Sequence, residues 1–427
     1  MKQVKDAFVE VLVIFFVGGL VGSIMSVISN LFVIAVKWLS QQRMNSDILN
    51  INFGGFDLSM SSLVFLWVAA AGMVCIKKVF NIQKWAGPAD SMYAAHQPDS
   101  PLDVKQGFAS TLAAFTSLCG GASVGQYGPI VHFGATMGVV ISKLQLRKRA
   151  GFSRLPREVS LGCGVAAAIS AGFNAPIAGI IFAHEAILRH FSVRAIAPIT
   201  VASITASSFG NYLFPQTLTF QITSAAPALA EIVPLLVILS PVFAAVAIAF
   251  MWSLRYATAT AASMSVTPVA VPFIGATICG VIGIFVPQAL GLGIGSVNSM
   301  ISGEFLVPLL AAVLVAKIIM TSACIGFGVF GGVFSPALFI GVAAGALSAQ
   351  LIAPLGFSAA GSVISVAAMA AVSSSVIGAP LSAVLIVLEL SQSYEYAVAA
   401  MIAVMVCTLI THRLFGHSFF DRQLLDR

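Results

Sequence analysis

The residues best suited to chemistry lie in the segment Gly120-Gly-Ala-Ser-Val-Gly-Gln-Tyr-Gly-Pro129, inside an apolar stretch. No Asp, Glu, Lys or Arg occurs from Gln106 to Ser142. The glycines break a helix here, and Pro129 favours a new start because proline suits the first helical position. A helix start leaves backbone N–H groups without partners and carries about half a positive charge. Such groups attract anions, so the segment predicts anion recognition by backbone amides.

Two other segments have the same character. Ser335 in Gly331-Gly-Val-Phe-Ser-Pro336 is a natural N-cap before a proline, and Gly87-Pro88 is a third helix start. Moving a bare anion into a low-dielectric medium costs tens of kcal/mol, whereas one helix end returns about 0.3–2 kcal/mol. Several ends must therefore converge; the alternative for each glycine is close helix packing. The candidate pathway residues are Gly87, Pro88, Gly125, Gln126, Tyr127, Gly128, Pro129, Gly332, Val333, Phe334, Ser335 and Pro336.

Tyr127 is the side chain that sets the chemistry of the first segment. A phenol has a pKa of about 10, so Tyr127 is neutral at pH 7 and is a poor proton carrier. It can donate its O–H to a halide or fill the path with its ring, and we expect it to face the path. The alternative is a packed aromatic ring that points away from the path.

A few ionisable side chains lie in or beside apolar runs. Glu185 and Glu389 end equivalent helices, and we expect structural ion pairs for them with Arg189, one turn beyond Glu185, or with Lys317. Lys317 is the sole basic residue in its apolar run and favours anions through its field. His184 beside Glu185 is a weaker candidate for a proton-linked site.

The composition places these residues in a membrane. Hydrophobic residues make up 59% of the 427 residues, charged residues make up 8%, and the mean hydropathy is +1.01. Apolar runs of about 20 residues span a bilayer as helices, and we expect at least ten helical segments with the first retained near the N-terminus. The net charge of +6 is not a nucleic-acid signature, because the basic residues gather in one short loop that the positive-inside rule places in the cytoplasm. This loop contains Lys143, Arg147, Lys148, Arg149, Arg154 and Arg157.

The chain contains an internal repeat. Phe173-Asn-Ala-Pro-Ile-Ala-Gly-Ile-Ile-Phe-Ala-His-Glu185 recurs as Ile377-Gly-Ala-Pro-Leu-Ser-Ala-Val-Leu-Ile-Val-Leu-Glu389. Tyr127-Gly-Pro-Ile-Val-His-Phe-Gly134 likewise resembles Phe334-Ser-Pro-Ala-Leu-Phe-Ile-Gly341, at nearly the same offset. Inverted halves with broken helices that meet near the bilayer midplane are common in transporters, so we expect that arrangement.

These motifs resemble those of the CLC family of chloride channels and proton/chloride antiporters, from about Lys84 to the C-terminus. Gly-Gln-Tyr-Gly-Pro129 is similar to the family's G-R-E-G-P segment, and Gly331-Gly-Val-Phe-Ser-Pro336 to its G-G-x-F-x-P segment. Trp85-Ala-Gly-Pro-Ala-Asp90, Phe173-Asn-Ala-Pro176 and the tail from His417 also fit the family. The resemblance implies an all-α membrane fold, a homodimer, and one pathway with bound chloride per subunit.

Several departures from the family pattern bear on mechanism. Tyr127 replaces the family's gating Glu, and Gln126 replaces the preceding Arg. Ala186 stands where transporters have an inner proton-handling Glu. The family's central Ser falls at Gly87 or Pro88, and its inner-mouth Tyr aligns with Phe420, so both hydroxyls are lost.

The sequence therefore predicts passive transport of chloride or a similar small anion, without stoichiometric proton exchange. The alternatives are a proton-coupled antiporter with a relay such as His184 and Glu185, and a non-conducting receptor or scaffold. We expect one transmembrane domain over residues 1–427, with repeat halves at about 60–215 and 230–415 and no C-terminal regulatory domain. The expected setting is the lipid of the inner membrane, with both termini cytoplasmic. We expect no enzymatic activity, metal, other cofactor or nucleic-acid partner.

Overall fold

A computed structural model describes residues 2–44, 50–53, 56–97, 102–146, 155–214, 220, 222, 227–357 and 360–425. Apart from one antiparallel hairpin, β1 (Asn50–Phe53) with β2 (Phe56–Ser59), the regular structure in these ranges is helical, which confirms the predicted all-α class. The basic loop at 147–154 lies outside the described residues.

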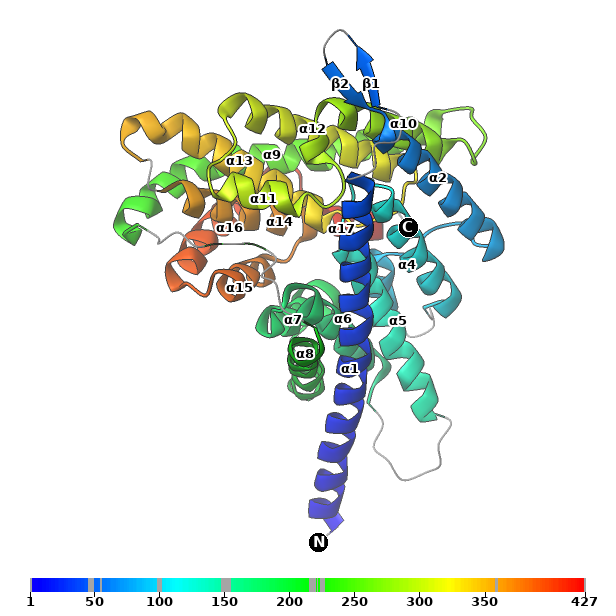
Figure 1. Ribbon diagram of the computed structural model, residues 1–427. Coiled ribbons are helices and arrows are strands. Elements are labelled where there is room, and N and C mark those ends of the chain that lie inside the picture. The colour runs from blue at the N-terminus through cyan, green and yellow to red at the C-terminus, as the bar shows by residue number, and fades with distance from the viewer. Residues whose placement is uncertain are drawn as a thin grey trace.

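The helices of the first part of the chain are α1 (Lys2–Met44), α2 (Ser61–Val79), α3 (Pro88–His96), α4 (Val104–Cys119), α5 (Tyr127–Leu146), α6 (Arg157–Phe173), α7 (Pro176–Phe182), the π-helical turn η1 (Ala183–Leu188) and α8 (Val193–Leu213). Those of the second part are α9 (Leu229–Ser263), α10 (Val271–Phe285), η2 (Pro287–Ala289), α11 (Ile294–Ile301), α12 (Val307–Gly326), α13 (Phe334–Ile352), η3 (Ala353–Leu355), α14 (Gly361–Ile377), α15 (Pro380–Ser391), α16 (Tyr394–Leu414) and α17 (Phe419–Leu425). Figure 1 shows their arrangement.

Many of these helices are apolar, but only some are long enough to cross a bilayer. In the described ranges, seven helical segments have the length and hydropathy of a membrane span. Others are apolar but shorter, among them α7, α10, α14 and α15. Short apolar helices of this kind end within the membrane depth, where backbone ends are tolerated only if protein or a water-filled cavity covers them. The fold is therefore a membrane protein with broken helices, as the sequence predicted.

The centre of the molecule is formed by α5 packed on α6 and α13 packed on α14. Almost every described residue of α14 is buried. Small residues make this packing possible, because a Cβ at Gly134 of α5 would overlap the carbonyl of Gly164 in α6. For these two glycines, close helix packing is the reason for the residue type.

The repeat is inverted, and two reciprocal contacts show it. The Glu185 carboxylate accepts the backbone N–H groups of Leu381 and Ser382 at 2.9 and 2.8 Å, at the start of α15. The Glu389 carboxylate accepts those of Ile177 and Ala178 at 2.9 and 2.8 Å, at the start of α7. Each helix pair thus places the end of one copy against the start of the other, which requires the two copies to run antiparallel.

The same contacts correct one prediction. The expected ion pair between Glu185 and Arg189 is wrong, because the Glu185 carboxylate caps α15 and also accepts the Ser382 hydroxyl at 2.6 Å. Arg189 pairs with Asp421 of α17 instead. His184, next to Glu185 in the sequence, donates its Nδ1–H to the His190 carbonyl at 3.1 Å and stacks on Phe191.

Candidate anion pathway

The two Gly-rich breaks predicted from the sequence meet in the fold. The Gly125 N–H donates to the Gly332 carbonyl at 2.6 Å, and the Gly332 N–H donates to the Gly125 carbonyl at 2.7 Å. This antiparallel bridge needs glycine, because a Cβ at Gly125 would lie 2.9 Å from the Gly332 oxygen. Both N–H groups donate to carbonyls within the bridge, so neither is available to a ligand.

The amides that remain for a ligand lie just beyond the bridge. In the described part of the chain, the N–H groups of Gly128, Val333, Phe334 and Ser335 donate to no backbone carbonyl. They stand at the first turns of α5 and α13, where the peptide dipoles add positive potential. Pro129 and Pro336 complete these turns without N–H groups of their own.

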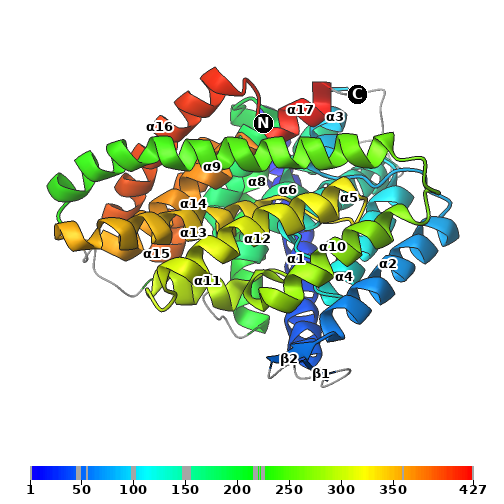
Figure 2. The ribbon, with the colours of Figure 1, turned by 90° about the horizontal axis from the view of Figure 1, so that it is seen from above.

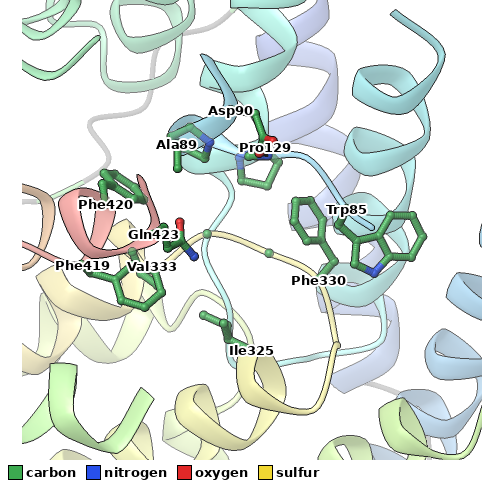
Figure 3. A pocket seen from close by; sticks show the side chains of 14 residues that line it. Trp85, Ala89, Asp90, Pro129, Ile325, Phe330, Val333, Phe419, Phe420 and Gln423 are labelled. Carbon is green, nitrogen blue, oxygen red and sulfur yellow. Dashed lines mark hydrogen bonds between the residues drawn. The ribbon is translucent and has the colours of Figure 1, made fainter. Parts of the chain in front are cut away.

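A large cavity of about 260 Å³ lies on one side of this bridge (Figure 3). The third break contributes to it, because α3 lies beside α17 at one edge of the molecule (Figure 2). The structure thus brings Gly87 and Pro88 together with Phe420, although they are far apart in the sequence. The lining residues are Trp85, Gly87, Pro88, Ala89, Asp90, Pro129, Ile325, Phe330, Gly331, Gly332, Val333, Phe419, Phe420 and Gln423. We call this space the inner cavity.

A second, much smaller cavity of about 10 Å³ lies on the other side and is called the outer cavity. That volume has room for about one water-sized particle. Two buried polar atoms of its lining residues, Gln126 Oε1 and Ser335 Oγ, have no hydrogen-bond partner among the residues that the structure describes. Buried polar groups rarely lack a hydrogen-bond partner, so these two atoms indicate a place for a small polar ligand. The lining residues are Gln126, Tyr127, Phe220, Leu292, Ile294, Val297, Ser335 and Leu338.

An aromatic cluster separates the two cavities. The chain passes from Val333 in the inner cavity to Ser335 in the outer one through Phe334, and from Tyr127 in the outer cavity to Pro129 in the inner one. The Tyr127 ring stacks on Phe173 at 3.7 Å between centroids and meets the edge of Phe334 at 5.8 Å. The Tyr127 side chain is 3% exposed.

The two expectations for Tyr127 each describe part of its position. Its ring lines the outer cavity, as predicted for a residue that faces the path. Its hydroxyl, however, donates to the Gly172 carbonyl at 3.3 Å, so the O–H in this conformation belongs to the end of α6.

Lys317 lies behind the wall of the outer cavity. Its ammonium donates to the carbonyls of Ala289 and Gly291 at 3.0 and 2.7 Å and lies 4.6 Å from the centroid of the Phe339 ring. Phe339 follows Leu338, which lines the cavity. Lys317 is fully buried, and two backbone carbonyls and an aromatic ring take up its ammonium group, so its expected effect on an anion stays a prediction.

His184 and Glu185 are not among the residues that line either cavity. Sequence reasoning also missed two polar residues that do line the inner cavity. Asp90 accepts the Gly87 N–H at 2.6 Å, a contact that the Gly-x-x-Asp spacing of a helix start signals. Gln423 lies three residues after Phe420, and this spacing places both on one helix face.

Fold and site together define a class: helical membrane proteins of two inverted halves, with broken helices meeting at a buried polar site. Residues 68–412 match the voltage gated chloride channel family, and the chain belongs to this family, the CLC proteins. A putative chloride channel protein, ClcB-like, of Ralstonia nicotianae is 28% identical over 362 residues, covering 80% of each chain. The H(+)/Cl(-) exchange transporter ClcA of Yersinia pestis is 24% identical over 438 residues, covering 96% of this chain and 87% of that one.

Solved structures share the fold. A slow cyanobacterial Cl-/H+ antiporter superposes with a TM-score of 0.80 at 20% identity and covers 97% of both chains. A CLC-type fluoride/proton antiporter superposes with a TM-score of 0.72 at 19% identity, covering 96% of this chain and 97% of that one. At these identities the likeness shows the architecture alone.

Proposed function

We propose that this protein carries chloride or a similar small anion passively across the membrane, with no fixed exchange of protons. Family membership and the named relatives support the substrate class. The two cavities and the amides of α5 and α13 between them support the route. In this proposal Gly128, Val333 and Phe334 supply the backbone donors, and Gln126 and Ser335 add side-chain contacts on the outer side.

The observation that carries the proposal is the neutral ring of Tyr127 between the two cavities. Among the described residues that line the outer cavity, none has a side chain that is charged at neutral pH. The Glu185 carboxylate, the nearest candidate for an inner proton relay, is engaged by two amides and a hydroxyl at the start of α15. Proton exchange needs a group that changes charge along the anion route, and a phenol at neutral pH does not supply it.

The outer cavity requires a movement before an anion can pass. Its volume of about 10 Å³ is far below that of the inner cavity, about 260 Å³. The Tyr127 ring and Phe334 form the partition, so rotation of the Tyr127 side chain away from Phe173 is the proposed opening step. Side-chain rotation of this kind costs the stacking contact and one weak hydrogen bond.

The deciding experiment uses the purified full chain in liposomes with opposing chloride and pH gradients. We expect a reversal potential that follows the chloride gradient alone. A reversal potential that moves with the pH gradient would establish coupled antiport instead. A panel with fluoride, nitrate and chloride identifies the anion that passes most readily.

A non-conducting receptor or scaffold is the remaining alternative. It predicts no halide flux in the wild-type protein and none in Tyr127→Ala. Flux that appears only in Tyr127→Ala would instead show a pathway that Tyr127 closes.

We further propose a homodimer in the inner membrane, with both termini cytoplasmic and one pathway in each subunit. The repeat halves, at about 60–215 and 230–415, are taken from the offset of the motifs. The reciprocal Glu185 and Glu389 contacts support that division, because each half caps a helix of the other.

A further inference from the structure

The inner cavity offers an anion few side-chain donors. Gly87, Pro88 and Phe420 line it without a hydroxyl. Asp90 also lines it, and its carboxylate repels an anion and already accepts the Gly87 N–H at 2.6 Å. An anion that rests in this cavity needs hydrogen-bond donors, because desolvation without them is costly. Among the described lining residues, the side chains that carry N–H donors are Trp85, with one, and Gln423, with two.

Gln423 meets this need. Among the described residues that line the inner cavity, it is the only one with a neutral amide side chain, which carries two N–H donors. Gln423 and Phe420 share one face of α17, and Figure 3 shows the Gln423 side chain reaching toward the segment that carries Val333. The amide thus faces the same space as the backbone N–H groups at the start of α13.

An ion pair to the first half of the chain helps to hold α17 in this position. Arg189 follows the turn η1 in the first half of the chain, and its guanidinium pairs with Asp421, between Phe420 and Gln423 in the sequence. The Asp421 carboxylate also accepts the Ser418 hydroxyl at 2.7 Å and so fixes the first turn of α17. Arg189 has a φ of 55°, in the left-handed region that disfavours residues other than glycine.

We propose that Gln423 donates a hydrogen bond to the anion in the inner cavity, and that Arg189 is a positioning residue which acts on it through Asp421. The proposal rests on the anion transport proposed above. The amide of Gln423, one turn along α17, takes the donor role that a hydroxyl at position 420 would have and that Phe420 cannot fill. Arg189 sets the distance between α17 and the segment 331–333.

The direct test is chloride binding to the purified full chain in detergent, by calorimetry, alongside flux in liposomes. We expect Gln423→Leu to weaken binding by about threefold to tenfold, the loss of one hydrogen bond to an ion. Gln423→Glu should weaken it further, since a carboxylate has no donor and repels the anion. Gln41→Leu, at an exposed position on α1, is the matched control and should bind as the wild type does. Unchanged chloride binding in Gln423→Leu, with wild-type binding intact, would overturn the role of Gln423.

The positioning role has its own readout. Arg189→Gln should lose as much affinity as Gln423→Leu, and the double variant should lose no more than either, because both act through one contact. Arg189→Lys, which keeps the charge, should recover part of the affinity. Arg194→Gln removes an exposed charge nearby and should have no effect. Additive losses in the double variant would overturn the positioning role.

Both tests stay separate from the proposed function. A wild-type protein that binds chloride without conducting it would reject passive transport and still allow the binding comparison. If the wild-type protein conducts chloride and Gln423→Leu binds chloride as tightly as the wild type does, passive transport is retained and the role of Gln423 is rejected. Thermal midpoints of all variants exclude losses that come from unfolding.

Discussion

Tyr127 stands between a large cavity and a small one, where ring contacts and a hydrogen bond hold it. The ring stacks on Phe173, and the hydroxyl donates to Gly172 over a long 3.3 Å. Stacking and area burial outweigh a single long hydrogen bond in holding the side chain. Packing of the Tyr127 ring, more than its hydrogen bond, therefore keeps the partition closed.

This leads to different outcomes for two substitutions. Tyr127→Ala removes the partition, and we expect halide flux to rise by about tenfold or more, since each 1.4 kcal/mol taken from a barrier gives a factor of ten. Tyr127→Phe keeps the ring and should change flux less than about threefold, by loss of the weak bond to Gly172. The rates are measured by chloride efflux from liposomes. Equal rates in the two variants would contradict a steric partition.

Gly125 is a second residue whose type is dictated by a close approach. A Cβ there would lie 2.9 Å from the Gly332 oxygen and 3.0 Å from a carbon of the Pro336 ring. We expect Gly125→Ala to lower unfolding stability by about 1–3 kcal/mol, as overpacking does, and to abolish flux. Gly295→Ala in α11, where nothing lies within 4 Å, is the control and should be tolerated. Thermal unfolding in detergent and the flux assay measure the two effects.

At the scale of elements, α7 and α15 are each capped by the other copy of the repeat. We expect Glu185→Gln and Glu389→Gln to destabilise the protein by similar amounts, about 1–2 kcal/mol each, because both carboxylates accept two backbone N–H groups. Glu304→Gln, at an exposed position, should change stability little. Denaturation midpoints give the comparison, and a large loss in only one of the two caps would contradict their equivalence.

Helix breaks were predictable because proline and glycine act locally. The starts of α3, α5, α7, α13 and α15 fall at or within two residues of the prolines that signalled them. The partner of Glu185 was not predictable, since the nearest positive charge in the sequence, Arg189, faces another element. The Gly125–Gly332 bridge was not predicted for the same reason. It joins two segments that are far apart in the sequence, and neither segment alone shows that the N–H group of its glycine is hydrogen-bonded to the other.

At the scale of the whole molecule, α7 and α15 lie side by side and present apolar residues outward. Ile177 and Leu381, at the starts of the two helices, are 51% and 55% exposed. We expect this face to meet a second subunit, and light scattering in mild detergent should give the mass of two chains. Ile177→Trp with Leu381→Trp should shift the protein toward one chain while leaving flux per subunit intact, because the proposed function gives each subunit its own pathway. A wild-type mass of one chain would contradict the dimer.

The repeat motifs sufficed to anticipate two related halves, because the same Pro-to-Glu spacing occurs in each. The spacing alone does not show that the two copies run antiparallel, which the reciprocal Glu185 and Glu389 contacts reveal. The inner cavity could be anticipated only in part. Phe420 was tied to it by resemblance, whereas Asp90 and Gln423 enter through the packing of α3 against α17, which joins segments from opposite ends of the chain.

The cap on α7 also imposes an order on biosynthesis. The helix leaves the ribosome long before Glu389 has been translated, by about 10–40 s at 5–20 residues per second. During that interval the amides of Ile177 and Ala178 must be met by water or by the translocation machinery. A nascent chain that stalls before Glu389 would leave the start of α7 without its carboxylate cap.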